Sequence, residues 1–126
     1  MRLMYDSTFV IDLLDGVPAA IERQRAIFES GDEPFVNEVV VCEVRAGLRS
    51  MEEPSLVGIL EPVEFLQPGP ETAMLAGAWR RSAHERGFRL SLADALIAAA
   101  AVAADAAVLT RNMRDFQLTP VRVETY

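Results

Sequence analysis

Short apolar runs alternate with amphipathic stretches along the chain, and this alternation predicts strands separated by helices. Apolar runs of a few residues, bounded by polar or turn-forming residues, are typical of buried strands. Five segments are predicted as strands: residues 3–5, 34–36, 63–66, 106–110 and 121–124. Stretches whose apolar residues recur every three or four positions are predicted as helices: residues 9–14, 19–29, 38–49, 71–86 and 91–104, with a shorter one near 56–60.

The order of these elements predicts the fold class. Strands that alternate with helices form largely parallel sheets, because each helix carries the chain back across a face of the sheet. The sequence therefore predicts an α/β fold, a three-layer α/β/α sandwich with a mainly parallel central sheet. No internal repeat, low-complexity segment or linker interrupts residues 1–126, so we expect one domain.

Capping residues mark the starts of several helices. Ser7 or Thr8 is expected to cap the first helix, and Asn37 the helix that begins at residue 38. Ser91 followed by Asp94 fits the spacing of a capping box at the start of an alanine-rich helix.

Composition favours a folded protein that does not enter a membrane. Hydrophobic residues make up 51% of the 126 residues, which is enough for a substantial core. The charge-free stretch from Ala95 to Ala104 is far shorter than the roughly 20 residues of a membrane span, so it is expected to be a buried helix. The first residues carry no apolar segment typical of a signal peptide. We expect a cytoplasmic protein in which the single Cys42 is unpaired and buried.

Charge is distributed unevenly. The formal net charge is −7, which argues against nucleic-acid binding through a generally basic surface. Residues 1–64 carry 13 acidic residues and 5 arginines, whereas residues 65–126 carry 6 acidic residues and 7 arginines. All 12 basic residues are arginine and there is no lysine. This absence is most simply a matter of composition, but it limits the chemistry the chain can perform.

Four acidic residues lie where a parallel sheet could gather them. Asp6 follows the first strand, Glu43 lies in an otherwise apolar helix, Asp94 begins the alanine-rich helix, and Asp115 follows the strand that ends at Thr110. Ligands in open α/β sheets bind outside the carboxyl ends of the strands. Carboxylates that meet there repel one another unless divalent cations bind between them.

Each acid also has an ordinary structural explanation. Asp6 could cap a helix, and Glu43 could be a boundary residue paired with an arginine, although it lies on or beside an inward face. Asp94 could serve only in its capping box and on the helix dipole. Asp115 could be a surface loop acid. These alternatives remain open when the residues are considered one at a time.

Considered together, the segments around these acids resemble the motifs of a known family. They resemble, in order and spacing, the four acidic motifs of PIN-domain nucleases and in particular of the VapC toxins of toxin–antitoxin pairs. The segments are Tyr5–Leu14, Val41–Leu48, Leu92–Ala99 and Leu109–Phe116. The resemblance covers nearly the whole chain. Thr8 stands where many relatives have Asn, and Asn112 where some have Asp.

The resemblance implies an endoribonuclease. Asp6, Glu43, Asp94 and Asp115 would form a metal-binding and catalytic pocket, and Mg²⁺ or Mn²⁺ suits oxygen ligands of this kind. Water activated by the metal would hydrolyse the RNA phosphodiester bond. The resemblance also implies a cognate VapB-like antitoxin and a homodimer.

Other polar residues are assigned supporting or surface roles. Thr8, Thr110 and Asn112 could orient metal-bound water, and the arginines nearest the motifs are candidates for RNA contact: Arg45, Arg49, Arg111 and Arg114. His84 is expected at an exposed helix end and Trp79 in the core or a dimer contact. Asp12 and Asp15 are expected to be solvated, and the Arg80-Arg81 pair is expected to be a surface feature, with contact to RNA left open.

Two rival functions are weighed against this hypothesis. Receiver domains and haloacid-dehalogenase-type phosphatases also place an aspartate after the first strand, but both normally need a lysine, which this chain lacks. A non-catalytic PIN-like domain that only binds RNA or protein would be expected to lose part of the acidic set, whereas all four positions are filled. The nuclease hypothesis is therefore preferred.

Overall fold

The computed structural model describes residues 1–126 and places five strands in one sheet. The strands are β1 (Arg2–Tyr5), β2 (Glu33–Asn37), β3 (Glu64–Leu66), β4 (Ala107–Leu109) and β5 (Val123–Glu124). Their order across the sheet is β3-β2-β1-β4-β5, and every neighbouring pair is parallel. The α/β class predicted from the sequence is confirmed, and β1 is the central strand.

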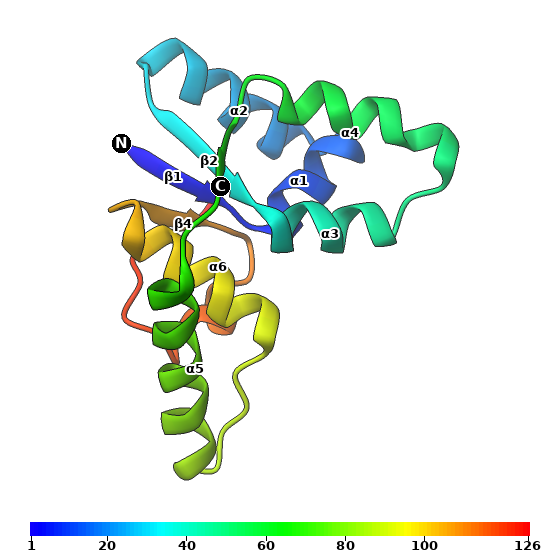
Figure 1. The fold of residues 1–126 in the computed structure, drawn as a ribbon. Helices are drawn as coiled ribbons and strands as arrows, with labels where there is room; N and C mark the ends of the chain where they lie inside the picture. Colours follow the sequence, from blue (N-terminus) through cyan, green and yellow to red (C-terminus); the bar gives the residue numbers. More distant parts are fainter.

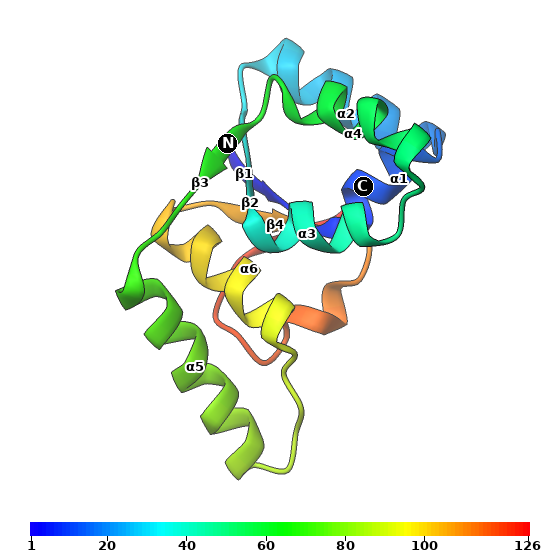
Figure 2. The same ribbon diagram turned by 45° about the vertical axis from the view of Figure 1, so that its right-hand side comes forward.

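Six α-helices connect and cover these strands. They are α1 (Ser7–Leu14), α2 (Pro18–Ser30), α3 (Glu38–Ala46), α4 (Glu53–Leu60), α5 (Pro70–Glu85) and α6 (Leu92–Ala103), with short 3₁₀ turns η1 (Ser50–Glu52) and η2 (Met113–Phe116). Helices α1, α2 and α4 lie on one side of the sheet, and α5 and α6 on the other (Figures 1 and 2). Helix α6 packs against β1 and β4, and α5 lies outside α6. The predicted three-layer arrangement is confirmed.

Small side chains allow α5 and α6 to pack closely. The alanine-rich stretch of α6 is buried from Ile97 to Ala101, as its charge-free sequence predicts. Its other buried alanines join residues of α5 and the following loop in a second apolar cluster: Ala76, Ala83, Leu90, Ala95 and Ala99. The main cluster includes β1, whose residues Leu3, Met4 and Tyr5 have no exposed surface. No helix has the length and apolar character needed to cross a bilayer.

The helix boundaries agree with most of the predicted caps. The Asn37 side chain accepts a hydrogen bond from the Val40 backbone N–H at 3.1 Å, and Ser91 accepts one from the Asp94 backbone N–H at 3.1 Å. The first helix is different, because Asp6 and not Ser7 or Thr8 occupies the capping position. Both hydroxyl residues are inside the helix, where their side chains are free to make other contacts.

The region after α3 was predicted less accurately. Helix α3 ends at Ala46, three residues before the predicted end, with Gly47 as its C-cap. Helix α4 begins at Glu53, although Pro54 was expected to be part of a break. Proline fits this position because the first-turn N–H groups of a helix have no partner within the helix. A proline is therefore compatible with either a break between helices or the first turn of a helix, and the sequence alone does not distinguish the two.

The pairing of β1 with β4 fixes the position of the candidate site. The register pairs Leu3 with Ala107 and Tyr5 with Leu109, so that Asp6 and Thr110 emerge side by side. The Asp6 backbone N–H donates to the Leu109 carbonyl at 3.0 Å, which extends the ladder by one more bond. The carboxyl ends of these two central strands therefore present polar side chains at a single edge.

Candidate metal-binding site

Asp6 is a buried carboxylate that accepts hydrogen bonds from two threonine hydroxyl groups. Its exposed fraction is 3%. Thr110 donates to its Oδ2 at 2.7 Å, and Thr8 donates to the same oxygen at 3.0 Å. Ser7 lies near the other oxygen, Oδ1, at 3.4 Å. Hydrogen bonds that favour the charged form of a carboxylate compensate for the loss of water around it.

Glu43 approaches Asp6 through Ser7. The Ser7 hydroxyl donates to the Glu43 Oε1 at 2.9 Å, so one side chain lies between the two carboxylates. The Glu43 side chain is exposed, which corrects the expectation that it lies on or beside an inward face. Val40 and Val44 form the buried side of α3. Glu43 is one residue, or about 100° of helix rotation, away from Val44, so it faces the open edge of the site.

Asp94 lies in the first turn of α6, where the negative charges of the other three acids act on its carboxyl group. Burial raises the pKa of its carboxyl group to about 6; a hydrogen bond from Ser91 opposes this shift, and the negative charges of Asp115, Asp6 and Glu43 add to it. A like charge disfavours ionisation only when it is nearby. The negative charges of Asp115, Asp6 and Glu43 are therefore near enough to act on the Asp94 carboxyl group.

Asp115 belongs to η2, directly after the loop that leaves β4. Its backbone N–H donates to the Asn112 carbonyl at 3.1 Å, and its side chain is exposed. Helix α6 packs against η2, which brings the Asp115 segment beside the first turn that carries Asp94. Figure 2 shows η2 next to the beginning of α6. All four predicted acids thus lie at the carboxyl-end edge of the sheet, and their catalytic role stays a prediction.

The donor set fits a hard divalent cation held partly through water. All available ligands are carboxylate or hydroxyl oxygens, which Mg²⁺ and Mn²⁺ prefer. No three acidic, histidine or cysteine side chains converge tightly enough to enclose an ion by themselves. Mg²⁺ commonly binds one or two carboxylates and keeps several waters, so this open spacing suits it better than a closed protein cage would.

The supporting polar residues divide into two groups. Thr8 and Thr110 contact Asp6, and their hydroxyl oxygens are 3.2 Å apart. Asn112 supports the site through its backbone, because its N–H donates to the Thr110 Oγ1 at 2.9 Å while its side chain is exposed. Ser7 was considered only as a helix cap in the sequence. The signal that could have identified it is its position next to Asp6 within the first acidic motif.

An ion pair between a buried aspartate and a half-exposed arginine beside the site was not anticipated. Asp12 was expected to be solvated, but its exposed fraction is 3% and it pairs with Arg111. The Tyr126 hydroxyl donates to the other Asp12 oxygen at 2.5 Å. Burial and the contact with Asp12 raise the pKa of that hydroxyl above its usual range. The sequence could not show this pair, because its members are separated by 99 positions or more.

The remaining candidate residues are on the surface or in the core. Arg45 pairs with Glu53 at 2.6 Å and Arg49 with Glu52 at 2.8 Å, whereas Arg114 is exposed and has no acidic partner. Their contact with RNA stays a prediction. His84 is exposed, as expected for a helix end, and Trp79 packs against both apolar clusters. Cys42 is exposed on α3, which corrects the expectation that it is buried.

A family model described as PIN domain matches residues 3–120. This chain belongs to the PIN domain family. Among curated relatives of this PIN domain, Ribonuclease VapC19 of Mycobacterium tuberculosis (strain H37Rv) is 32% identical over 120 residues, and the match covers 95% of each chain. The same name and values apply to the strain CDC 1551 / Oshkosh.

Solved structures confirm the fold of this PIN domain. The structure of VapBC2 from Rickettsia felis bound to a DNA fragment from its promoter contains a chain with a TM-score of 0.86 and 18% identity, covering 100% of this chain and 99% of that one. A chain of VapBC-1 from nontypeable Haemophilus influenzae gives a TM-score of 0.83 and 21% identity, covering 99% and 98%. At these identities the likeness supports the three-layer architecture alone.

Proposed function

We propose that this protein is a divalent-metal-dependent endoribonuclease and the toxin of a toxin–antitoxin pair. The observation that carries the proposal is the gathering of four acidic side chains from the four acidic motifs at one edge of the sheet. The extent of the match to Ribonuclease VapC19, 32% over 95% of both chains, supports the same assignment. We propose residues 1–126 as one nuclease domain.

The residues of the chain hold and orient the reacting groups. Thr8 and Thr110 fix the Asp6 Oδ2, so the Oδ1 is the oxygen better placed to receive a cation. Glu43, Asp94 and Asp115 supply further oxygens around the same opening. A bound divalent ion would lower the pKa of its water for attack on a phosphodiester and stabilise the leaving oxygen. Asn112, through its hydrogen bond to Thr110, keeps the loop after β4 against the site.

Mg²⁺ is the proposed ion, and Mn²⁺ is the expected substitute. Both are hard cations that accept carboxylate ligands together with water and substrate phosphate. The repulsion that Asp94 feels from its neighbours would be relieved by the positive charge of either ion. A cation would also allow the phosphates of RNA to approach an otherwise negative edge.

A VapB-like antitoxin is the proposed protein partner. Several chains with the same fold come from structures described as toxin–antitoxin or VapBC complexes, including one from Klebsiella pneumoniae with a TM-score of 0.77. The helices on the α1 side of the sheet carry large exposed apolar side chains that a partner could cover: Ile11, Ile21, Phe28 and Val57. A homodimer and a cytoplasmic location stay part of the proposal.

An RNA cleavage assay tests the proposal. Purified protein is incubated with total cellular RNA and Mg²⁺ or Mn²⁺, and discrete cleavage is expected. EDTA should abolish it, and Asp6→Asn should lower the rate by at least about 100-fold, because a metal ligand that acts in the transition state is lost. The matched control is Asp15→Asn, the same substitution at an exposed acid after α1.

The outcomes separate the mechanisms. Cleavage that persists in EDTA would contradict a metal-dependent reaction. Loss of activity in both Asp6→Asn and Asp15→Asn would indicate a general effect on folding rather than on the site. If the wild-type protein binds RNA but cleaves none under any metal, the non-catalytic PIN-like domain becomes the better description.

A further inference from the structure

The arginines without acidic partners concentrate in one part of the molecule. Seven of the twelve arginines form ion pairs with carboxylates of the chain. Of the five that do not, three lie within ten residues of one another, at the end of α5 and in the loop that follows: Arg80, Arg86 and Arg89. Between residues 72 and 93 the only acidic residue is Glu85, which pairs with Arg81 at 2.8 Å. In a protein with a net charge of −7, this segment is locally basic.

Arg80 and Arg89 line a surface pocket of about 490 Å³, together with residues of α5 and the following loop: Arg81, His84, Phe88 and Leu90. We call the surface the α5–α6 basic patch and define it by four arginines, one histidine and one phenylalanine: Arg80, Arg81, Arg86, Arg89, His84 and Phe88. Phe88 is 57% exposed, and the Arg86 guanidinium carbon is 5.9 Å from the centre of its ring. The Arg80 Nε donates to the Leu90 carbonyl at 3.1 Å, and Leu90 is buried. The loop is therefore fixed to α5, while the side chains of Arg86, Phe88 and Arg89 face solvent.

The patch is joined directly to the candidate metal site. Residues 86–91 lead from the end of α5 to the first turn of α6, in which Asp94 lies five residues after Arg89. Figure 2 shows this loop rising from the lower end of α5 to the beginning of α6. A polyanion bound at the patch would thus lie on the path into the acidic edge.

We propose that the α5–α6 basic patch binds the single-stranded part of the RNA substrate outside the cleavage site, through its phosphates and one base. Arg80 and Arg86 each donate only their Nε to a backbone carbonyl and pair with no carboxylate, so their terminal NH groups can bind phosphate oxygens. An exposed aromatic ring beside them can stack on an unpaired base. An acidic protein segment would be attracted by the same charges but would leave the exposed ring of Phe88 without a specific role. The inference rests on the proposed ribonuclease function, which it extends by naming where the substrate is held.

An RNA-binding measurement tests the patch separately from cleavage. A fluorescent single-stranded RNA is titrated with full-length protein in EDTA, and Kd is measured between 50 and 300 mM salt. Arg86→Gln with Arg89→Gln should weaken binding about tenfold near 0.1 M salt and reduce the slope of log K against log salt by about 1.4, because each lost phosphate contact contributes about 0.7 for single strands. Phe88→Ala should weaken binding by about tenfold and leave that slope unchanged, because stacking involves no counterion release.

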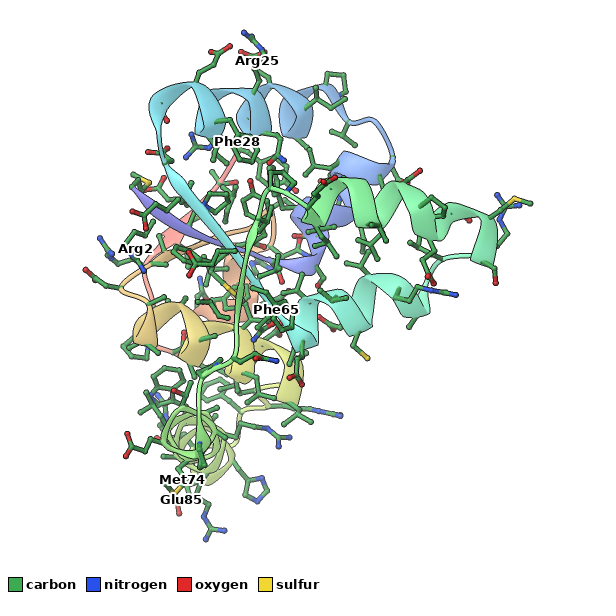
Figure 3. The ribbon with its side chains drawn as sticks, turned by 45° about the horizontal axis from the view of Figure 1, so that its top comes forward. Arg2, Arg25, Phe28, Phe65, Met74 and Glu85 are labelled. Carbon is green, nitrogen blue, oxygen red and sulfur yellow. The ribbon has the colours of Figure 1, made fainter.

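Matched controls are available on α2 and at the other end of the chain. Arg25→Gln with Arg122→Gln removes the same charge from exposed arginines, and Phe28→Ala removes a ring that is 42% exposed. Figure 3 shows Arg25 and Phe28 on α2, far from α5, which carries the labelled Glu85. Thermal unfolding of each variant confirms that it folds. Neither control should change Kd by more than the general effect of net charge.

The possible results separate RNA binding by the patch from the proposed ribonuclease function. If the Arg86 and Arg89 variant binds RNA like the Arg25 and Arg122 control, the patch is not an RNA site, even if the wild-type protein cleaves RNA. If that variant loses binding to a poly-glutamate peptide but keeps its affinity for RNA, the patch is a docking surface for an acidic protein and the proposal fails. If the patch variants show the expected losses but the wild-type protein cleaves no RNA with any metal, the patch stands and the proposed ribonuclease function fails.

Discussion

The Asp6 side chain has only 3% exposure, and it receives hydrogen bonds from residues near both ends of the chain. Thr8 belongs to the helix that Asp6 begins, whereas Thr110 is 104 positions away. Both donate to the same oxygen. The other oxygen lies near Ser7, which in turn contacts Glu43. Thr8 and Thr110 therefore occupy the Asp6 Oδ2, and the Oδ1 lies on the side of Ser7 and Glu43.

The raised pKa of Asp94 predicts how stability changes with pH in the absence of metal. Its folded-state pKa of about 6 lies above its ordinary value of 3.8, so the folded protein holds this proton more tightly than the unfolded chain. The resulting stabilisation is complete below pH 3.8 and is lost as the pH rises through 6. Asp94→Asn should therefore be more stable than the wild type at pH 7 in EDTA, by about 1 kcal/mol after allowance for its partial exposure.

Urea unfolding at several pH values between 4 and 7 measures this difference. The gain of Asp94→Asn should grow across that range, while Asp15→Asn, at an exposed position, should show no such growth. A constant difference between Asp94→Asn and the wild type at every pH would show that Asp94 ionises normally.

Two arginines after β4 differ in what they stabilise. Arg111 pairs with the buried Asp12, whereas Arg114 is exposed and has no acidic partner. Arg111→Gln should cost roughly 2 kcal/mol, because it leaves a buried carboxylate with only the Tyr126 hydroxyl as a partner. Arg114→Gln should change stability by less than about 0.5 kcal/mol. Urea unfolding at pH 7 compares the two, and equal effects would mean that the Asp12 pair contributes nothing to the fold.

At the scale of elements, each acid depends on a different structural device. Asp6 extends β1, Glu43 is carried by α3, Asp94 by the capped first turn of α6, and Asp115 by η2. Helix α3 packs on both α1 and α6, so it links the elements that hold the other acids. The position of Glu43 consequently depends on how α3 begins.

Asn37 makes this dependence testable. Its side chain caps α3 and also donates to the Leu96 carbonyl of α6 at 3.4 Å. Asn37→Ala should lower stability by about 1 kcal/mol through loss of the cap. It should also lower RNA cleavage, because Glu43 lies on the helix that loses its anchor. Ser55→Ala on α4 is the control, since that side chain is exposed and makes no hydrogen bond. Thermal unfolding and initial cleavage rates are the measurements, and an unchanged unfolding temperature would contradict the capping role.

The elements were predictable to the extent that local patterns determine them. The alanine-rich α6 and the Asn37 and Ser91 caps depend on short-range periodicity and spacing, and these predictions are confirmed. The start of α4 was missed because a proline such as Pro54 can either interrupt a helix or lie in the first turn of one. The burial of Asp12 was missed because its partners come from distant positions, 111 and 126. The exposure of Cys42 and Glu43 was missed because an almost wholly apolar segment gives little indication of which side faces the core.

At the scale of the whole molecule, acidic and basic side chains gather in different places. The acidic residues meet at the candidate metal site, and arginines without acidic partners gather at the α5–α6 basic patch. The four acidic side chains at the candidate site come from four different elements, the end of β1, α3, α6 and η2, yet they meet at the end of the central strands. The α5–α6 basic patch lies beyond α6, on the opposite side of the sheet from α2. The sequence indicated the excess of arginine in the second half. It could not indicate which arginines lacked partners, because ion pairing depends on side-chain positions in three dimensions.

The central position of β1 affects when the candidate site can form during synthesis on the ribosome. Strand β1 and Asp6 are synthesised first, but the neighbouring strand β4 and the Thr110 hydroxyl that fixes Asp6 are encoded about a hundred residues later. Chains fold progressively from the amino terminus during synthesis, and contacts distant in sequence form last. A nascent chain that ends before residue 110 cannot assemble the acidic edge. The candidate metal site of this PIN domain can therefore form only after residue 110 has been synthesised.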